Sequence, residues 1–412
     1  MAMRDLPSLD PSDRFAREKP GVMMNYAVLT ILPAALMASA PVAASEPGAS
    51  SAPLEVEESD TADLPALSPH WIIAENNWAS GASRIFDGDT GKMLGQITLS
   101  SLANSTTDPL GRYFFTAESI WTKQTRGTRQ DFLTVRDART LKILRDIPLP
   151  GRLLVGNRKY SLGVSGDGTL AFIYNMDPAS SVTIVDIAAG RVLRTVEVPG
   201  CAMTTGFGRR AAISLCSDGS AGLVTTSADG KRSELKASAP FFTADSDPVF
   251  DNFAVNSVSG EAVFLTYSGK VFVATAAQEM AIAAPWSLQE AAGYPAGVTT
   301  PQSVNWYPGG RQPLAYSKAA DRLFVLMHMG EYWSQKVPGQ ELWTFEASTR
   351  KLLKRTKLED DITDIAVSQD ESPLLFLGSE ENLHVWDAMT LEEKHVIAEA
   401  SHGMLSVPVA GW

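Results

Sequence analysis

Two cysteines are the residues of this chain whose type and spacing predict a specific chemistry. Cys201 and Cys216 are its only cysteines, and 15 positions separate them. An even pair at this separation favours a disulfide in an exported protein, which would contribute about 3 kcal/mol by restricting the unfolded chain. Two free buried thiols are the alternative. Neither cysteine has a histidine or a second cysteine at ligand spacing, so we expect no metal site there.

The histidines and glycine-rich stretches show no catalytic pattern. The five histidines are scattered along the chain: His70, His328, His384, His395 and His402. The sequence contains no nucleophile elbow, phosphate-binding loop or dinucleotide-binding fingerprint. We therefore predict structural roles for the histidines, and no catalytic, cofactor-binding or metal-binding residue on this chain.

A short pattern that recurs seven times organises the rest of the chain. In each copy an apolar strand ends at an acidic or small residue, a turn follows, and a second strand begins with basic and apolar residues. The copies are RIFDGDTGKMLGQI (Arg84–Ile97), FLTVRDARTLKIL (Phe132–Leu144), VTIVDIAAGRVLRTV (Val182–Val196), LVTTSADGKRSEL (Leu223–Leu235), VFVATAAQEMAIA (Val271–Ala283), ELWTFEASTRKLLKR (Glu341–Arg355) and LHVWDAMTLEEKHVI (Leu383–Ile397). Spacings of about 40 to 50 residues are typical of stacked repeats.

Further strands precede these copies and complete the repeat. An example is VSGDGTLAFIY at Val164–Tyr174, which contains a turn followed by an apolar run. Asp-Gly and Ser-Gly turns between such runs are hairpin signals. About four short strands per repeat make one propeller blade. We therefore predict an all-β fold, a seven-bladed β-propeller over residues 69–412, with one or two helical turns at most within Pro285–Ala292.

The N-terminal region predicts export. Basic residues between positions 14 and 19 precede an apolar run at 22–37, and small residues follow. This order is typical of a secretory signal peptide, which we place at residues 1–44. Residues 45–68 are rich in Ser, Ala, Pro and acid, which predicts an extended arm. The apolar run is short and contains Pro33, so we expect a periplasmic protein with no membrane anchor.

Composition limits the class of partner. The net charge is −12 and the isoelectric point is about 5.0. Nucleic-acid binding requires a basic surface, so we expect no nucleic-acid partner.

Several longer segments occur in an order that matches a known family. They are RGTRQDFLTVRDARTL (Arg126–Leu141), IPLPGRLLVG (Ile147–Gly156), VPGCAMTTGFGRRAAISLCSDGS (Val198–Ser220), WYPGGRQPLAY (Trp306–Tyr316) and ITDIAVSQDESPLLFLG (Ile362–Gly378). From about Trp71 to about Pro408 the chain resembles the heavy (large) subunit of the bacterial quinoprotein amine dehydrogenases, of methylamine or aromatic amine dehydrogenase type. Its paired cysteines are similar in placement and spacing to that family's intrachain disulfide.

The resemblance implies a division of labour between two kinds of chain. Two seven-bladed heavy chains pair with two small, cysteine-rich light chains in an α2β2 heterotetramer. The light chain carries a tryptophan tryptophylquinone cofactor and supplies the catalytic base. A primary amine, either aliphatic such as methylamine or an aromatic aralkylamine, is oxidised to aldehyde and ammonia. Electrons then pass to a blue copper protein of amicyanin-like or azurin-like type. With two cysteines, this chain does not fit the light chain, so we expect no quinone on it.

The resemblance also implies one site residue. In the family an aromatic residue near the first propeller strand borders the substrate entrance. The matching region is NNWASGAS at Asn76–Ser83, which makes Trp78 the candidate for the substrate channel. Packing between strands is the other role open to this side chain.

A standalone periplasmic propeller, either a lactonase-like enzyme or a binding module, is the competing hypothesis. The subunit hypothesis predicts a large, partly apolar patch on one propeller face. The standalone hypothesis predicts a polar surface and a charged axial cavity that could bind a metal.

Overall fold

The computed structural model describes residues 63–75, 82–100, 103–123, 126–153, 156, 158–276, 280–401 and 403–408. They belong to one compact unit within Glu58–Trp412. The predicted signal peptide, and the predicted arm up to residue 62, lie outside the described residues.

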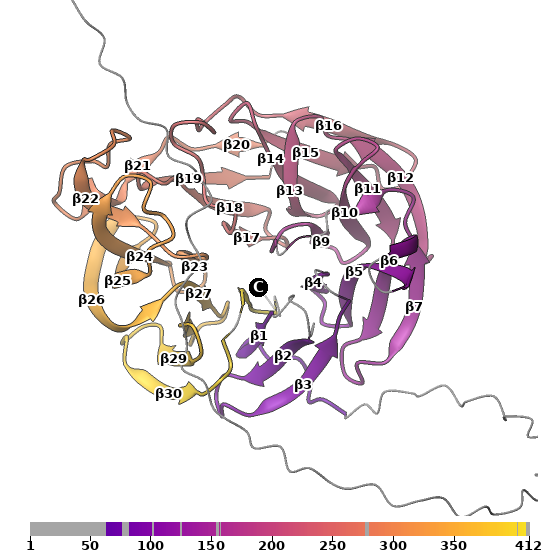
Figure 1. Cartoon of the computed structure of the whole chain (residues 1–412), viewed down its shortest axis with the longest axis horizontal. Coiled ribbons are helices and arrows are strands. Elements are labelled where there is room, and N and C mark those ends of the chain that lie inside the picture. The colour runs from indigo at the N-terminus through magenta and orange to yellow at the C-terminus, as the bar shows by residue number, and fades with distance from the viewer. Residues whose placement is uncertain are drawn as a thin grey trace, which may run out of the picture. The chain divides into compact units, whose positions relative to one another are not determined.

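The described residues form seven antiparallel sheets that follow one another around a common centre (Figure 1). This confirms the predicted seven-bladed propeller. Blade 1 contains β31 (Leu405–Ser406), β1 (Trp71–Ala74), β2 (Ala82–Asp87) and β3 (Met93–Thr98), and blade 2 contains β4 (Asn104–Thr107), β5 (Tyr113–Lys123), β6 (Arg126–Asp137) and β7 (Ile143–Pro148). Blade 3 contains β8 (Arg152–Leu153), β9 (Leu162–Val164), β10 (Leu170–Asp177), β11 (Ser181–Asp186) and β12 (Arg191–Glu197), and blade 4 contains β13 (Cys201–Gly206), β14 (Ala211–Cys216), β15 (Ala221–Thr226) and β16 (Ser233–Ala237).

Blade 5 contains β17 (Ala254–Asn256), β18 (Glu261–Leu265), β19 (Lys270–Thr275), β20 (Ala281–Ile282) and β21 (Trp286–Ser287). Blade 6 contains β22 (Val304–Pro308), β23 (Leu314–Ser317), β24 (Arg322–Glu331), β25 (Gly339–Glu346) and β26 (Lys351–Ile362), and blade 7 contains β27 (Asp364–Val367), β28 (Leu374–Gly378), β29 (Leu383–Asp387) and β30 (Glu393–Ile397).

The recurring sequence pattern corresponds to the outer hairpin of every blade. The seven hairpins are β2–β3, β6–β7, β11–β12, β15–β16, β19–β20, β25–β26 and β29–β30. The acidic residue of the pattern caps the turn: in blade 2, Asp137 Oδ1 accepts hydrogen bonds from the backbone N–H groups of Arg139 and Thr140. Those bonds favour the ionised carboxyl, so the pKa of Asp137 is lowered.

Strand burial follows position within a blade. The middle strand β28, LLFLG, is buried at every residue because neighbouring blades cover both of its faces. The outermost strand of the same blade, β30, has four of its five residues exposed or half-buried. The one helix of the described residues, α1 (Leu288–Ala291), lies inside the predicted Pro285–Ala292 segment. Ser287 caps it by accepting a hydrogen bond from the backbone N–H of Glu290.

The ring closes by pairing the two ends of the propeller sequence. β31 pairs with β1, so that Ile73 lies opposite Ser406 and Ala74 opposite Leu405. Gln312 holds the closing strand from blade 6, because its side chain accepts from the Leu405 backbone N–H at 3.2 Å and donates to the Leu405 carbonyl at 3.0 Å. The same amide donates to the Ile365 carbonyl of β27 at 2.8 Å. One side chain thus joins three blades.

A buried ion pair supports the same closure. Arg311 Nε and Nη2 donate to the two carboxylate oxygens of Asp364 at 2.8 and 2.5 Å, and Nη2 also donates to the Gly403 carbonyl at 3.1 Å. The Asp364 side chain has no exposed surface. Burial lowers the pKa of Arg311, but the hydrogen bonds and charge of Asp364 outweigh that effect and raise it overall.

The described part of the predicted arm packs on the propeller. Leu64 is 2% exposed and belongs to an apolar cluster that includes Ile97 and Ala138. Its backbone N–H donates to the Arg139 carbonyl at 2.8 Å. Residues 63–68 therefore already contact blades 1 and 2.

Candidate docking face and axial cavity

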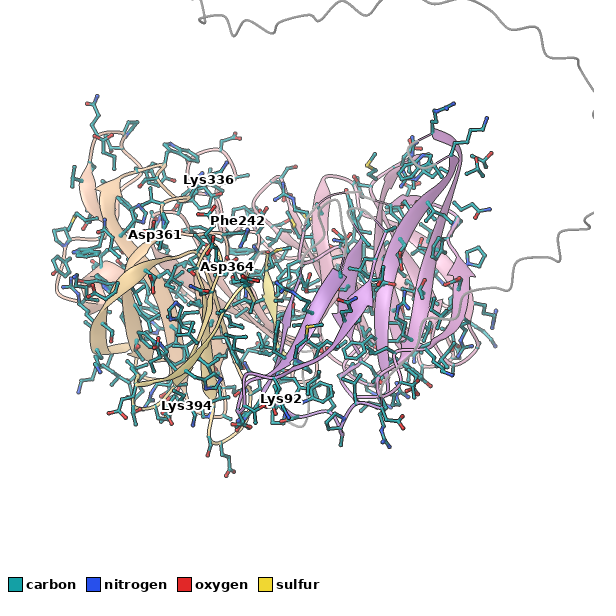
Figure 2. All side chains as sticks on the ribbon, turned by 60° about the horizontal axis from the view of Figure 1, so that its bottom comes forward. Lys92, Phe242, Lys336, Asp361, Asp364 and Lys394 are labelled. Carbon is teal, nitrogen blue, oxygen red and sulfur yellow. A yellow bond between two sulfur atoms is a disulfide. The ribbon has the colours of Figure 1, made fainter. Side chains whose placement is uncertain are left out.

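One end of the ring carries the longer connections. Antiparallel order places the link between the second and third strands of every blade at the same end, which we call the hairpin face. Strands β5 and β6 contain 11 and 12 residues and project there, whereas β28 and β29 contain 5 each. Figure 2 shows Lys336 and Asp361 at this end, and Lys92 and Lys394 at the opposite end.

Seven exposed apolar side chains lie on the connections and strand ends of the hairpin face. Trp333 is 47% exposed and Val304 is 64% exposed. The set comprises Ile120, Met176, Val298, Val304, Met329, Trp333 and Val337. Exposed apolar residues elsewhere lie on separate turns of the opposite end or on outer strands, as Leu110 and Met389 do. Four of the seven, Val304, Met329, Trp333 and Val337, belong to blade 6, so this part of the hairpin face offers several apolar side chains to a partner.

Trp333 stands on a rigid aromatic base. Its ring lies 4.9 Å from the ring of Tyr332 and 5.8 Å from that of Tyr267. Tyr332 in turn contacts Tyr307, with ring centroids 5.8 Å apart, and its hydroxyl donates to the Ser246 carbonyl at 2.5 Å. Because its supports are fixed, Trp333 loses little conformational freedom when a partner covers it. Exposed aromatic anchors of this kind dominate protein interfaces.

The innermost strands of all seven blades surround a cavity of about 150 Å³. Each blade contributes lining residues, among them Ile73, Ser105, Leu162, Thr205, Ala254, Leu314 and Ile365. Glu75, Lys159, Tyr160 and Gln312 line one end of it, and all of these except the half-buried Lys159 are buried.

Lys159 is a charged group at that end, and its pKa is shifted. Its Nζ donates to the Leu405 carbonyl at 2.8 Å and lies 5.7 Å from the ring centre of Tyr160. Burial lowers the pKa of Lys159 to about 8, although the charges of Glu75 and Asp364 oppose the shift. Glu75 Oε1 accepts a hydrogen bond from Ser406 Oγ at 2.6 Å. The cavity therefore has charged groups at one end, which is one part of what the standalone hypothesis predicted.

In the part of the chain that the structure describes, no three His, Cys, Asp or Glu side chains cluster closely enough to hold a metal ion. None of the described helices is long and apolar enough to cross a membrane.

Nearly all of the propeller matches one family. The sequence model of the methylamine dehydrogenase heavy chain (MADH) family matches residues 76–408. The chain belongs to the methylamine dehydrogenase heavy chain family. Heavy chains of this family are subunits of amine dehydrogenases, which makes this chain an oxidoreductase subunit and confirms the family resemblance seen in the sequence.

Individual heavy chains agree with the family match. The chain is 30% identical over 325 residues to the methylamine dehydrogenase heavy chain of Paracoccus versutus, covering 77% of this chain and 74% of that one. It is 28% identical over 323 residues to the heavy chain of Methylorubrum extorquens, covering 77% of each. A periplasmic gluconolactonase of Pseudomonas aeruginosa superposes with a TM-score of 0.52 at 15% identity, over 82% of this chain and 99% of that one. The last likeness shows the fold alone.

The predicted site residues of this heavy-chain family member have different outcomes. Cys201 and Cys216 are directly opposed on β13 and β14 and form a disulfide, so the linkage predicted for them is present. Trp78 lies outside the described residues.

Three of the histidines, His70, His328 and His384, lie in polar contacts, whereas His402 lies outside the described residues. His70 bridges blades 1 and 7, with Nδ1 2.8 Å from Asp89 and Nε2 3.0 Å from Asp370. Burial alone lowers its pKa, but the hydrogen bonds and charges of the two carboxylates raise it overall. His328 is buried beside Ser334, with 2.7 Å between Nε2 and Oγ, and burial lowers its pKa to about 4.

Three functional candidates were not predicted as such: Glu75, Lys159 and Trp333. Trp333 falls between strands, but its aromatic support comes from distant positions. Lys159 has no sequence motif around it, and its hydrogen-bond partner Leu405 lies 246 positions away. A basic residue beside the aromatic Tyr160, next to a predicted inner strand, is the one local signal available.

Proposed function

We propose that this chain is the non-catalytic heavy subunit of a periplasmic amine dehydrogenase. The match of the heavy-chain family over residues 76–408 carries this proposal, because it spans the propeller from the end of β1 to the closing strand. The leader-like sequence of residues 1–44 supports export to the periplasm.

The proposed reaction takes place on a partner chain. A small, cysteine-rich light subunit would carry tryptophan tryptophylquinone, which accepts the electrons of a primary amine and releases aldehyde and ammonia. Methylamine-like and aralkylamine substrates are both compatible with the family. A blue copper protein, amicyanin-like or azurin-like, would accept the electrons, and two heavy and two light chains would assemble as α2β2.

The hairpin face is the proposed docking surface for the light subunit. It offers exposed apolar side chains around Trp333, whose ring is fixed by Tyr332 and Tyr267. Covering such a surface excludes water, and water exclusion strengthens the electrostatic interactions of a redox site beneath it. The proposed tasks of this chain are to bind the light subunit, to shield its cofactor and to shape the substrate channel.

Trp78 is the proposed channel residue. β1 runs towards the hairpin face and ends at Ala74, four positions before Trp78. An aromatic side chain at the substrate entrance would restrict the size of the amine. Replacing Trp78 with alanine should therefore shift kcat/KM towards bulkier amines, and an unchanged ratio between methylamine and a large aralkylamine would refute the assignment.

Two matched methionines test the docking surface. Met329 on the hairpin face and Met389 on the opposite end are 43% and 49% exposed. A carboxylate introduced into an apolar interface loses its hydration, so Met329→Asp should weaken binding of the light subunit at least about tenfold, or about 1.4 kcal/mol. Met389→Asp should bind like the wild type. Binding would be measured by titrating purified light subunit.

The outcomes separate the surface from the function. Equal binding by both variants would reject the hairpin face as the docking surface, with the subunit assignment intact. Failure of the unaltered chain to bind any light subunit would reject the assignment itself.

A further inference from the structure

The wall of the axial cavity includes a lysine at one end. Lys159 lies on the connection before β9, is half-buried, and lines a cavity of about 150 Å³. A cavity of this size accommodates a molecule as large as benzene. The one hydrogen bond of Nζ to a described residue is to the Leu405 carbonyl, whereas an ammonium has three N–H donors.

The charges around Lys159 do not fully stabilise its ammonium. Glu75 and Asp364 act on it through their charges, but Asp364 is already paired with Arg311. Tyr160 donates its hydroxyl to the Phe253 carbonyl. With a pKa of about 8, roughly a quarter of Lys159 is the neutral amine near pH 7.5, which is roughly 200 times the fraction of an exposed lysine.

The rest of the cavity is apolar in its middle and polar at its other end. Phe115, Leu162 and Ile365 are among the apolar side chains of the wall. At the far end, Asn256 Nδ2 and Gln369 Oε1 are buried and have no hydrogen-bond partner among the described residues. Asn256 itself is 4% exposed. A ligand with a reactive head, a short apolar body and a polar tail complements this lining.

We propose that Lys159 forms a reversible imine with small aldehydes or ketones that enter the axial cavity. The neutral Nζ attacks the carbonyl carbon, and a proton moves from nitrogen to oxygen to give a carbinolamine. Loss of water then breaks the C–O bond and forms the C=N bond. A partly desolvated lysine of lowered pKa that faces a cavity with an apolar wall is activated as a nucleophile for carbonyl compounds. The negative charge of Glu75 favours the protonated imine.

This inference does not rest on the proposed function. Aldehydes are the product class of the proposed amine oxidation, but the site consists of this chain's own residues and requires no light subunit. Failure of either conclusion leaves the other standing.

Reductive trapping of the folded, full-length chain tests the site. The protein is incubated with propionaldehyde and cyanoborohydride at about pH 7.5, where hydride addition converts each imine to a stable propyl amine, and peptide mass spectrometry locates the label. The α-amino group serves as the internal reference, because such groups ordinarily have a pKa of about 8. Lys231, with an 82% exposed side chain, is the reference for ordinary lysines.

The result expected is that Lys159 is labelled at least about tenfold faster than Lys231, because its neutral fraction is far larger. This preference should shrink as the pH approaches 10. The Lys159→Arg variant keeps a donor for Leu405 and should lose this label alone, whereas Lys231→Arg should leave labelling at Lys159 unchanged. Labelling of the α-amino group and Lys231 without labelling of Lys159 in the wild-type protein would overturn the proposal.

Discussion

Replacing Arg311 with methionine should destabilise the propeller by about 3 kcal/mol. The substitution keeps the length and apolar stem of the side chain but removes the two donors that hold the Asp364 carboxylate at 2.8 and 2.5 Å. Thr363 Oγ1, at 2.6 Å, remains as its hydrogen-bond donor. Breaking a buried ion pair costs about 3–5 kcal/mol. The Arg311 side chain is 42% exposed, so water solvates part of the pair and the lower end of that range applies.

Urea unfolding of single and double variants measures this magnitude. The chain is followed by tryptophan fluorescence without reductant, and Arg311→Met is compared with Lys231→Met, which removes an exposed pair between Lys231 and Asp229 at 4.0 Å. That control should cost roughly 0–1 kcal/mol. Adding Asp364→Asn to Arg311→Met removes the unpaired charge and should restore a large part of the lost stability. A loss of less than about 1 kcal/mol in Arg311→Met, equal to the control, would refute the assigned role of the buried pair in ring closure.

Three further perturbations test other parts of the structure. His70→Gln should destabilise the chain more at about pH 6 than at about pH 8.5. Asp89 and Asp370 raise the folded-state pKa of His70, so the stabilisation from its charged form is present below the unfolded-state pKa and is lost as the pH rises through the folded-state pKa. Urea unfolding at both pH values checks this, and an equal loss of stability at both would contradict it. The double variant with alanine at both Cys201 and Cys216 should be less stable by about 3 kcal/mol, since the bridge closes a loop of 15 positions. An unfolding midpoint equal to that of the oxidised wild type would exclude this effect. Gly163→Ala should lower the free energy of unfolding by about 3 kcal/mol, because its Cβ would lie 2.2 Å from the Gly206 backbone nitrogen. The control Gly156→Ala, with no atom within 4 Å of its Cβ, should leave stability unchanged. Equal thermal midpoints for the two variants would show that β9 and β13 separate readily.

The sequence predicted the blades because their signals are local. In each outer hairpin the two strands and the turn are contiguous, and a residue such as Asp137 caps the turn through backbone groups two and three positions later. The cysteine pair was predictable for the same reason, because two adjacent strands of one blade place Cys201 opposite Cys216.

The candidate sites depend on contacts between distant segments. At one end of the cavity Lys159 of blade 3 contacts Leu405 of the closing strand, and Tyr332 of blade 6 is held by the carbonyl of Ser246, 86 positions earlier. Which inner-strand residues face the axis depends on the curvature of the whole ring, and no local pattern specifies it. The same dependence applies to Trp333, whose sequence context does not indicate the aromatic base beneath it.

Amine-dependent dye reduction by the purified chain, alone and with its light subunit, tests the central claim most directly. The account predicts no quinone absorbance and no activity from this polypeptide alone, with both present in the complex isolated from the native periplasm. Activity or quinone absorbance in the lone chain would contradict the assignment of the redox centre to a partner.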